Sequence, residues 1–197
     1  MKKNQILSSK ITLATTISGH WYKVGNKYYP SVTQILTAFP QSLQLTKWIA
    51  DHGWSESQKI KSEAGERGTK VHEGIVALLD KQTLNKDYYS LEEWWKLNTF
   101  LYWCRDCKVE IMDKEFLIFS KKYKYAGRVD FRGQVDGKYM IVDFKTSANI
   151  YDHYPLQVAA YAQAYKETYP TLGNIDSVAV LLLGSRSKKG YRFDVYN

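Results

Sequence analysis

Asp130, Asp143 and Lys145 are the residues of this 197-residue chain whose types and spacing are suited to catalysis. They flank Asp136-Gly137, which separates two runs rich in β-forming residues and is a strong signal for a hairpin with a two-residue turn. In that register Asp130 faces Asp143 directly, and Lys145, two residues further along the strand, points to the same face of the sheet. The hairpin therefore predicts two carboxylates and an ammonium group side by side.

The chemistry expected of this trio is metal-dependent hydrolysis of a phosphodiester. Two carboxylates about 5 Å apart repel each other unless a divalent cation lies between them. Carboxylate oxygens suit Mg²⁺ or Mn²⁺, and such a metal polarises a phosphate and lowers the pKa of an attacking water. Lys145 could orient that water or offset charge that grows on the phosphate. The alternative is two solvated aspartates, or a bulge that breaks the register, but the adjacent lysine favours the metal site.

The same register makes predictions for the rest of the hairpin. It places Arg128 opposite Lys145, beside the two aspartates. The other face carries apolar side chains from both strands, as expected of a core face: Val129, Phe131 and Val135 on the first strand, and Met140, Val142 and Phe144 on the second.

The spacing of apolar, capping and turn residues predicts a helical N-terminal half followed by a β-β-β-α-β core. The expected elements are a hairpin over 20–29, helices over 31–36, 43–51, 55–79 and 91–104 with Ser31, Ser55 and Ser90 as caps, strands over 110–119, 125–135 and 138–145, a helix from Asp152 to about residue 169, a strand over 177–183 and an edge strand over 191–196. We expect one domain over 1–197, of α/β (α+β) class, with a central mixed sheet flanked by helices; residues 1–18 are predicted to be a tail or a loosely held strand.

Composition indicates an anionic partner and excludes some cofactors. The net charge of +8 favours a partner such as nucleic acid, although solvated lysines would give the same value. Two cysteines, Cys104 and Cys107, are too few for an iron–sulfur cluster, and we expect two reduced, partly buried thiols. No run of residues is apolar enough to cross a membrane, and a secretory signal is not expected. The prediction is a soluble cytoplasmic protein of a bacterium or a phage-infected cell.

Three short motifs resemble a known family when they are taken in order. Gly127-Arg128-Val129-Asp130, then Asp143-Phe144-Lys145, then Gln157 and Tyr161 four residues apart match the G-x-x-D, D-x-K and Q-x₃-Y pattern of the RecB-like branch of the PD-(D/E)XK nucleases. Two upstream segments, 30–36 and 68–73, resemble the mitochondrial genome maintenance exonucleases and their phage and bacterial relatives. The resemblance covers roughly residues 30–183 and implies a restriction-endonuclease-like core.

The resemblance also implies further site residues. His72 would be a metal ligand from the long helix, with Gly68 one turn earlier permitting close approach of the backbone, and the carbonyl of Phe144 would be another ligand. Glu115 would complete the acidic cluster, although Glu110 and Asp113 compete for that role.

Residues around this centre are expected to position the substrate. Gln157 would position the substrate phosphate or Lys145, with Tyr161 supporting it, while an ordinary amphipathic helix is the alternative. Arg128 could bind a phosphate, and Thr146, next in the motif, is expected to contact the substrate.

Basic turns and aromatic residues are candidates for binding the nucleic-acid strand. Lys122 and Lys124, with Lys121, and a second group of Arg186, Lys188 and Lys189 are expected to supply backbone phosphate contacts, with solvated loop lysines as the alternative. Trp21, Trp48 and Trp54 are predicted to cover the site, and Trp94, Trp95 and Trp103 to belong to the core.

The function predicted from these observations is a Mg²⁺- or Mn²⁺-dependent deoxyribonuclease without an iron–sulfur cluster. We expect an exonuclease that prefers single-stranded DNA ends, acting in replication, recombination, repair or phage DNA processing. The alternatives are a structure-specific or restriction-like endonuclease and a non-catalytic DNA-binding module with the same fold.

Overall fold

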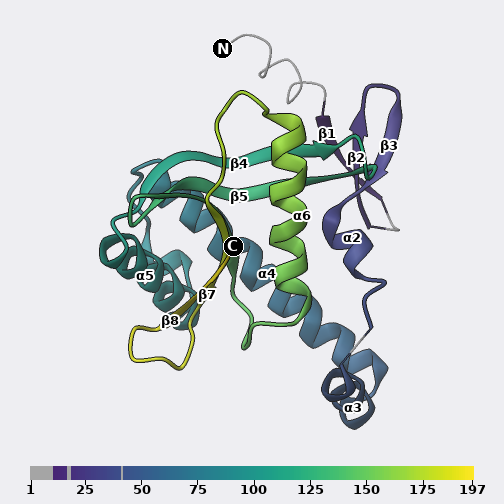
Figure 1. Ribbon diagram of the computed structural model, residues 1–197. Helices are drawn as coiled ribbons and strands as arrows, with labels where there is room; N and C mark the ends of the chain where they lie inside the picture. The colour runs from purple at the N-terminus through teal and green to yellow at the C-terminus, as the bar shows by residue number, and fades with distance from the viewer. Residues whose placement is uncertain (1–10, 17–18, 41) are drawn as a thin grey trace.

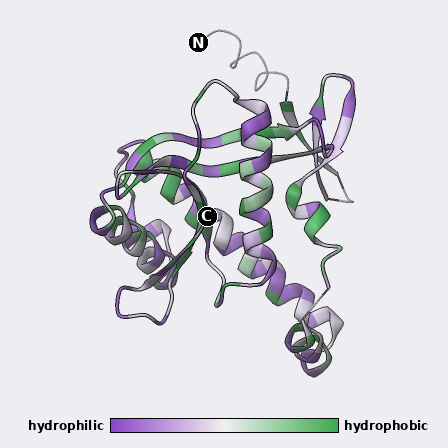
Figure 2. Cartoon of the chain, in the orientation of Figure 1, coloured by the Kyte–Doolittle hydropathy of each residue, from purple (hydrophilic) through white to green (hydrophobic). Residues whose placement is uncertain are grey.

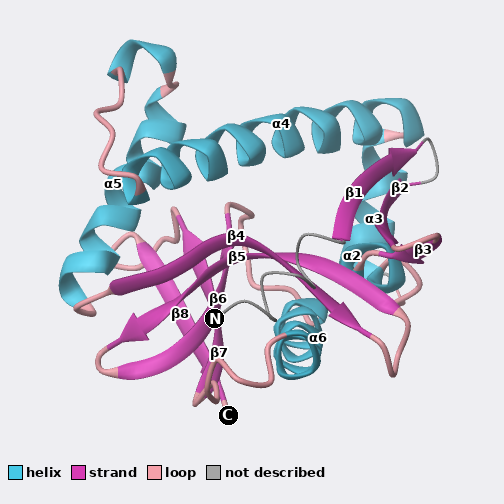
Figure 3. Cartoon of the chain, turned by 90° about the horizontal axis from the view of Figure 1, so that it is seen from above, coloured by secondary structure: helices cyan, strands magenta, loops and turns pink. Residues whose placement is uncertain are grey.

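Two β-sheets and a set of helices make up the part of the chain that the structure describes, residues 11–16, 19–40 and 42–197 of a computed structural model (Figures 1 and 3). The predicted mixed α and β architecture is therefore confirmed. Residues 1–10, 17 and 18, for which a tail or strand was predicted, lie outside the described residues, whereas 11–16 form a strand.

The larger sheet has the strand order β4-β5-β6-β7-β8. Its strands are β4 (Glu110–Ser120), β5 (Tyr125–Val135), β6 (Lys138–Lys145), β7 (Ser177–Leu183) and β8 (Tyr191–Tyr196). Only the β6–β7 pair is parallel among these neighbours, because helix α6 (His153–Thr168) carries the chain between those strands. The predicted mixed sheet and edge strand β8 are thus present.

The smaller sheet is antiparallel and lies against the start of β5. It consists of β1 (Ile11–Thr16), β2 (Gly19–Val24) and β3 (Lys27–Pro30), and a turn at Gly25-Asn26 joins the last two in the hairpin predicted over 20–29. The short helix α2 (Val32–Leu36) follows, with the Ser31 hydroxyl accepting the Gln34 N–H as the predicted cap. A bridge between Ser31 and Ala126 connects this N-terminal unit to the larger sheet.

The remaining helices are α3 (Leu43–His52), α4 (Trp54–Leu79), α5 (Leu91–Asp106) and a 3-10 turn, η1 (Lys86–Tyr88). Ser90 caps α5 in a capping box with Glu93, as its position predicts. The prediction of Ser55 as the cap of α4 was wrong, because the helix begins at Trp54 after Gly53, whose φ of 78° ends α3. The exposed first half of α4 projects beyond the sheet with α3 (Figure 1), and hydrophilic residues dominate it (Figure 2).

Helices cover both faces of the larger sheet, with α4 and α5 on one side and α6 on the other (Figure 3). The α5 side contains a cluster of aromatic rings around Trp103, which is 0% exposed. The α6 side contains Val158, Tyr161 and Tyr165 packed on Ile118 and Ile141. Burial of these two apolar layers is the main force that holds the sheet in place.

The predicted register of the β5–β6 hairpin is confirmed over the residues of β5 and β6 that pair with each other. Val135 pairs with Lys138 and Phe131 with Val142, around the turn at Asp136-Gly137. The paired ladder stops there, one residue before Asp130 would meet Asp143. Arg128 has no partner opposite it on β6, where Lys145 was predicted, because the β5–β6 ladder ends at Phe131.

Strands β4 and β5 both change faces at the point where the ladder to β6 ends. Val129 packs in the α6 cluster and Phe131 in the α5 cluster, although residues two apart in a regular strand share a face. On β4, Lys114 bonds to the α4 carbonyl of Val76, whereas Phe116 contacts the rings of α6. The prediction that Val129 shares a core face with Phe131 was therefore wrong.

The core predictions for tryptophan hold for two of three residues. Trp103 is fully buried and Trp94 packs against the same cluster, but Trp95 is 45% exposed and lies beside Gly184 and Gly190 in the loop between β7 and β8. The thiols of Cys104 and Cys107 are free and partly buried, as predicted. Burial raises the pKa of Cys104 to about 12 and also raises that of Cys107, so both thiols stay protonated near neutral pH.

Candidate active site

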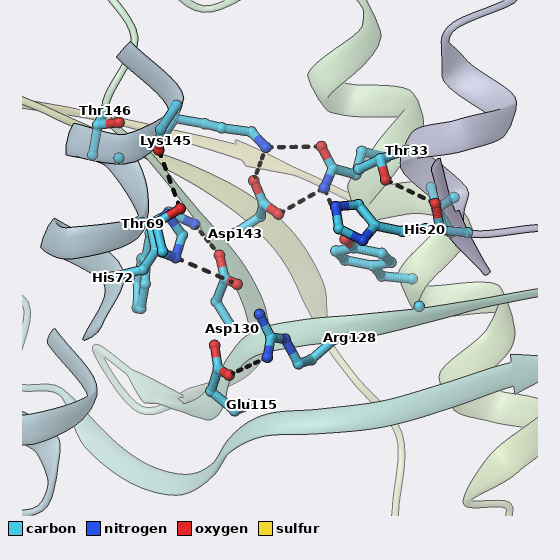
Figure 4. Close-up of a pocket in the computed structure, with 18 of the residues that line it drawn as sticks. His20, Thr33, Thr69, His72, Glu115, Arg128, Asp130, Asp143, Lys145 and Thr146 are labelled. Carbon is cyan, nitrogen blue, oxygen red and sulfur yellow. Dashed lines mark hydrogen bonds and ion pairs between the residues drawn. The ribbon is translucent and has the colours of Figure 1, made fainter. Parts of the chain in front are cut away.

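A cavity of about 920 Å³ opens where the two sheets, α4 and α6 meet (Figure 4). The residues around it come from β2, α2, the middle of α4, strands β4 to β6 and the start of α6. Most residues of the predicted centre line it: His72, Glu115, Arg128, Asp130, Asp143, Phe144, Lys145, Thr146, Gln157 and Tyr161. The structure thus brings together residues that lie up to 89 positions apart in the sequence.

Asp143, Lys145 and Gln157 form one connected polar network inside this cavity. Lys145 Nζ lies 2.8 Å from Asp143 Oδ2 and donates a hydrogen bond of 2.9 Å to Gln157 Oε1. The Gln157 amide nitrogen donates to Asp143 Oδ1 at 2.9 Å and to the Tyr161 hydroxyl at 2.8 Å. Asp143 and Lys145 share a face of β6, as predicted, and Gln157 fixes both.

Aromatic residues of α6 hold this network in place. Tyr161 is buried, and burial together with the nearby carboxylates of Asp143 and Asp130 raises its pKa well above the usual value, so it remains a neutral phenol. Lys145 Nζ lies 4.6 Å from the centre of the Tyr154 ring, a cation–π contact. Because these partners are packed in the helix, Lys145 has little rotational freedom.

Beyond the end of the β5–β6 hydrogen-bond ladder, the Asp130 side chain connects the two strands. Its Oδ2 accepts the backbone N–H of Phe144 at 2.8 Å, and its Oδ1 lies 3.7 Å from His72 Nδ1 (Figure 4). The two strands therefore separate at Asp130, and the carboxylate joins β5 to β6 across the gap. This separation, rather than direct cross-strand pairing, places Asp130 near Asp143.

The pKa values of Asp130 and Lys145 are shifted, because both groups lie close to other charges and are largely shielded from water. Burial raises the pKa of Asp130 to about 6; His72 opposes this rise and the charge of Asp143 adds to it. Burial alone would lower the pKa of Lys145, but Asp143 and then Asp130 outweigh it and the pKa is raised. Lys145 is therefore a stable cation beside two carboxyl groups.

Glu115 and Arg128 lie together at another part of the cavity. Their side chains form an ion pair of 2.8 Å, and the Arg128 guanidinium is about half exposed. Glu115 has a φ of 49°, which marks the place where β4 changes faces and turns this side chain toward the cavity. The competing candidate Asp113 pairs with Arg132, and Glu110 pairs in the sheet with Gln134, so Glu115 is the acidic residue of β4 that faces the cavity.

Gly68 allows α4 to approach closely the residue that follows β6, as predicted. A Cβ atom at Gly68 would lie 3.0 Å from Thr146 Oγ1, closer than ordinary contact. The carbonyl of Thr146 accepts a hydrogen bond of 3.0 Å from Lys96 Nζ, which ties the same residue to α5. Thr146 is thus held between two helices.

Gly68→Val is expected to destabilise the fold by about 1–3 kcal/mol more than Gly65→Val, because it crowds Thr146. Gly65 lies one turn earlier in α4 and has nothing within 4 Å of a built Cβ, so both variants carry the same cost of a β-branched residue in a helix. Chemical denaturation of the two purified variants measures the difference. Equal stabilities would contradict the close approach of α4 to Thr146.

Other predicted binding residues lie away from the cavity. Lys122 and Lys124 belong to the β4–β5 turn and do not line it; the Lys122 N–H bonds to Glu167 near the end of α6. Trp21, Trp48 and Trp54 are also absent from the cavity lining, so they do not cover the centre as predicted. Spacing in the sequence could not reveal these positions, because they depend on where the β4–β5 turn, the smaller sheet, α3 and the start of α4 lie relative to the cavity.

Several residues that line the cavity were not predicted. They come from the smaller sheet, α2 and α4: His20, Tyr22, Thr33, Thr69 and Glu73. Segments 30–36 and 68–73, identified by their resemblance to nucleases, contain the last three. His20 and Tyr22 carried no such signal, since they belong to a hairpin that is only brought to the site by the Ser31–Ala126 bridge.

The donor chemistry of this centre fits a divalent cation. Asp143 Oδ2 is buried beside the Lys145 ammonium at 2.8 Å, and a carboxylate oxygen with one such partner keeps a second lone pair available for a ligand. Asp130 and His72 add a second carboxylate and an imidazole close to each other. In the described arrangement no three His, Cys, Asp or Glu side chains already form a group able to hold a metal. The fit thus rests on the donor types and on their closeness inside the cavity.

Among the described helices, none is long and apolar enough to cross a membrane. No known protein-family model matches this chain, and no curated protein is significantly similar to it in sequence.

Proposed function

We propose that this chain is a divalent-metal-dependent nuclease with a restriction-endonuclease-like fold, acting as an exonuclease on single-stranded DNA ends. The observation that carries the proposal is the buried Asp143–Lys145–Gln157 network beside Asp130, inside an open cavity. Burying two carboxylates and an ammonium group costs free energy that a purely structural role does not recover well. Titratable groups gathered in a cleft are typical of a catalytic centre.

The size and charge of the cavity support a single strand as the substrate. A volume of about 920 Å³ lies within the range of pockets that hold small ligands, which suits one or two nucleotides rather than a whole duplex. The net charge of +8 favours a polyanion. A strand that must be inserted as single nucleotides enters most readily from a free end.

The residues of the chain have distinct roles in this proposal. Asp130, Asp143 and His72 would hold Mg²⁺ or Mn²⁺, with the Phe144 carbonyl and Glu115 as further candidate ligands. When bound, the metal supplies a polarised phosphate and a water of lowered pKa.

The side chains around the metal ligands would act on the substrate directly. Lys145 offsets charge on the phosphate, and Gln157 holds Lys145 in position for that task. Arg128, half exposed beside Glu115, is placed to bind a neighbouring phosphate. Thr146 lines the same cavity and is a further substrate contact.

A cleavage assay tests the proposal. The purified protein is incubated with end-labelled single-stranded DNA, the matching duplex and covalently closed circles, in Mg²⁺, in Mn²⁺ and in a chelator. We expect shortening of the single strand in either metal, no reaction in the chelator and intact circles. Cut circles would identify an endonuclease instead, and metal-independent binding without cleavage would identify a binding module. No metal-dependent cleavage of either linear substrate would refute the enzyme proposal.

A further inference from the structure

A second, smaller cavity of about 360 Å³ lies between α5 and the loop that joins β7 to β8. Aromatic and basic side chains line it: Trp95, Tyr102, Arg105, Lys188 and Lys189, together with Thr99. Trp95 and Tyr102 are seven residues apart on one face of α5, and they are 45% and 46% exposed. Two exposed rings on one helix face, rimmed by charged residues, form the kind of surface patch that marks binding sites.

The charge of this surface selects an anionic partner. Lys188 and Lys189 are exposed, and the Arg105 guanidinium lies 5.4 Å from the centre of the Tyr102 ring. Asp106 is the acidic residue in the lining, and its carboxylate is occupied by Arg105 at 2.9 Å and by the Tyr191 hydroxyl at 3.2 Å. Three cations and one paired carboxylate leave the cavity positive. Aromatic rings flanked by cations form the usual surface for unpaired bases and their phosphates.

The second cavity lies at the same end of the larger sheet as the candidate active site. Strands β6 and β7 are parallel, with Lys145 beside Leu182, so the segments that follow both strands leave the sheet at the carboxyl end of these strands. Lys96 of α5 connects the two places. Its Nζ bonds to the carbonyl of Thr146 in the large cavity, while a Cβ atom on Gly184 would lie 2.9 Å from its Cε. The same Gly184 position would meet the Trp95 ring at 3.2 Å, which brings the second cavity next to Lys96.

We infer that this aromatic and basic surface binds single-stranded DNA, as a stacking site for the part of the strand that lies outside the catalytic cavity. Bases would stack on Trp95 and Tyr102, and Lys188, Lys189 and Arg105 would contact the phosphates. The inference rests on the proposed function in taking the bound strand to be the substrate, but binding here does not require cleavage.

The test is fluorescence anisotropy with labelled oligothymidylates of about 2 and about 16 nucleotides, in a chelator so that no cleavage occurs. The variant Tyr102→Ala/Lys188→Glu removes one ring and reverses one charge. Lys138→Glu/Tyr139→Ala is the matched control, because it makes the same two changes at exposed residues at the other end of β6. Thermal melts verify that both variants fold, and Lys189→Glu is a second, milder variant.

We expect the variant at the second cavity to bind the longer strand about tenfold more weakly than wild type, with a shallower dependence on salt. Binding of the short strand, which fits in the catalytic cavity, should remain unchanged, as should both affinities of the control. An unchanged affinity for the longer strand, or an equal loss for both strands, would overturn the inference. If wild type bound the longer strand through this surface yet cleaved nothing in Mg²⁺, the proposed enzyme would fail while the stacking site stood.

Discussion

Asp143→Asn is expected to lower Mg²⁺-dependent cleavage of single-stranded DNA by more than about a hundredfold. Asparagine has the same shape and can still accept the hydrogen bond from Gln157 at the position of Oδ1. It lacks the negative charge at the position of Oδ2, the buried oxygen that faces the Lys145 ammonium at 2.8 Å. The variant therefore removes the proposed metal ligand while it preserves the local packing. Initial rates with an end-labelled strand measure the effect.

Two further variants separate catalysis from structure. Asp152→Asn makes the same chemical change at an exposed residue at the start of α6, and its cleavage rate should equal that of wild type. Asp143→Asn also leaves the Lys145 ammonium without its ion-pair partner, a loss of up to about 3–5 kcal/mol where both charges are buried. Adding Lys145→Met removes the unpaired charge, so the double variant should regain stability and remain inactive. Cleavage by the stable double variant at the wild-type rate would show that the pair is only structural.

The hairpin around Asp136-Gly137 shows how far the sequence determined the site. Its local turn chemistry correctly predicted the register from Val135 to Phe131, and the two-residue spacing correctly placed Lys145 on the same face as Asp143. These features depend on short-range geometry, which is determined by residues close together in the sequence. The same reasoning predicted the bounds of most strands and the caps of α2 and α5.

The point where β5 leaves β6 could not be predicted in the same way. Asp130 satisfies the Phe144 N–H with its carboxylate, and Glu115 adopts a left-handed backbone conformation in the neighbouring strand. Each is the conformation of a single residue, and each conformation becomes favourable only when α4 and α6 pack on opposite faces of the sheet. An alternating pattern continues through such a position, so the change of face at Val129 has no signature in the sequence. Irregular backbone of this kind is common beside functional sites.

Trp95 and Trp103 illustrate a different limit. Both lie in α5, an N-capped helix with apolar residues on more than one side, and spacing alone suggested that both are buried. The structure buries Trp103 against the sheet and leaves Trp95 facing the loop at Gly184 and Gly190. Which face of a helix meets the core depends on the partners it packs against. This information lies in residues far along the chain.

Trp103→Ala is expected to lower the free energy of unfolding by about 3–5 kcal/mol, the usual cost of removing a large buried ring. Trp103 is 0% exposed, and its ring lies between 5.4 and 6.2 Å from those of Phe100, Phe131, Phe144 and Phe193. Phe131, Phe144 and Phe193 are held in their strands and Phe100 in α5, so none of them can move far enough to fill the space. Urea denaturation followed by circular dichroism measures the loss.

Trp103→Phe provides the matched comparison for that prediction. The Nε1 proton of Trp103 finds no acceptor among the described residues, and a buried donor without a partner costs about 1–3 kcal/mol. Phenylalanine removes this donor and keeps most of the ring, so its variant should retain most of the stability that Trp103→Ala loses. Equal losses for both would mean that the indole is held by contacts other than packing.

Removing the Trp103 ring should also disturb the candidate active site. Phe144 lies in β6 between Asp143 and Lys145, and its side chain packs against Trp103 on the opposite face of that strand. The N–H of Phe144 is the group that holds Asp130. At temperatures where Trp103→Ala is still folded, we therefore expect a reduced cleavage rate, with Trp103→Phe close to wild type. A folded alanine variant with full activity would show that β6 is held in place by α6 alone, through Gln157 and Tyr161.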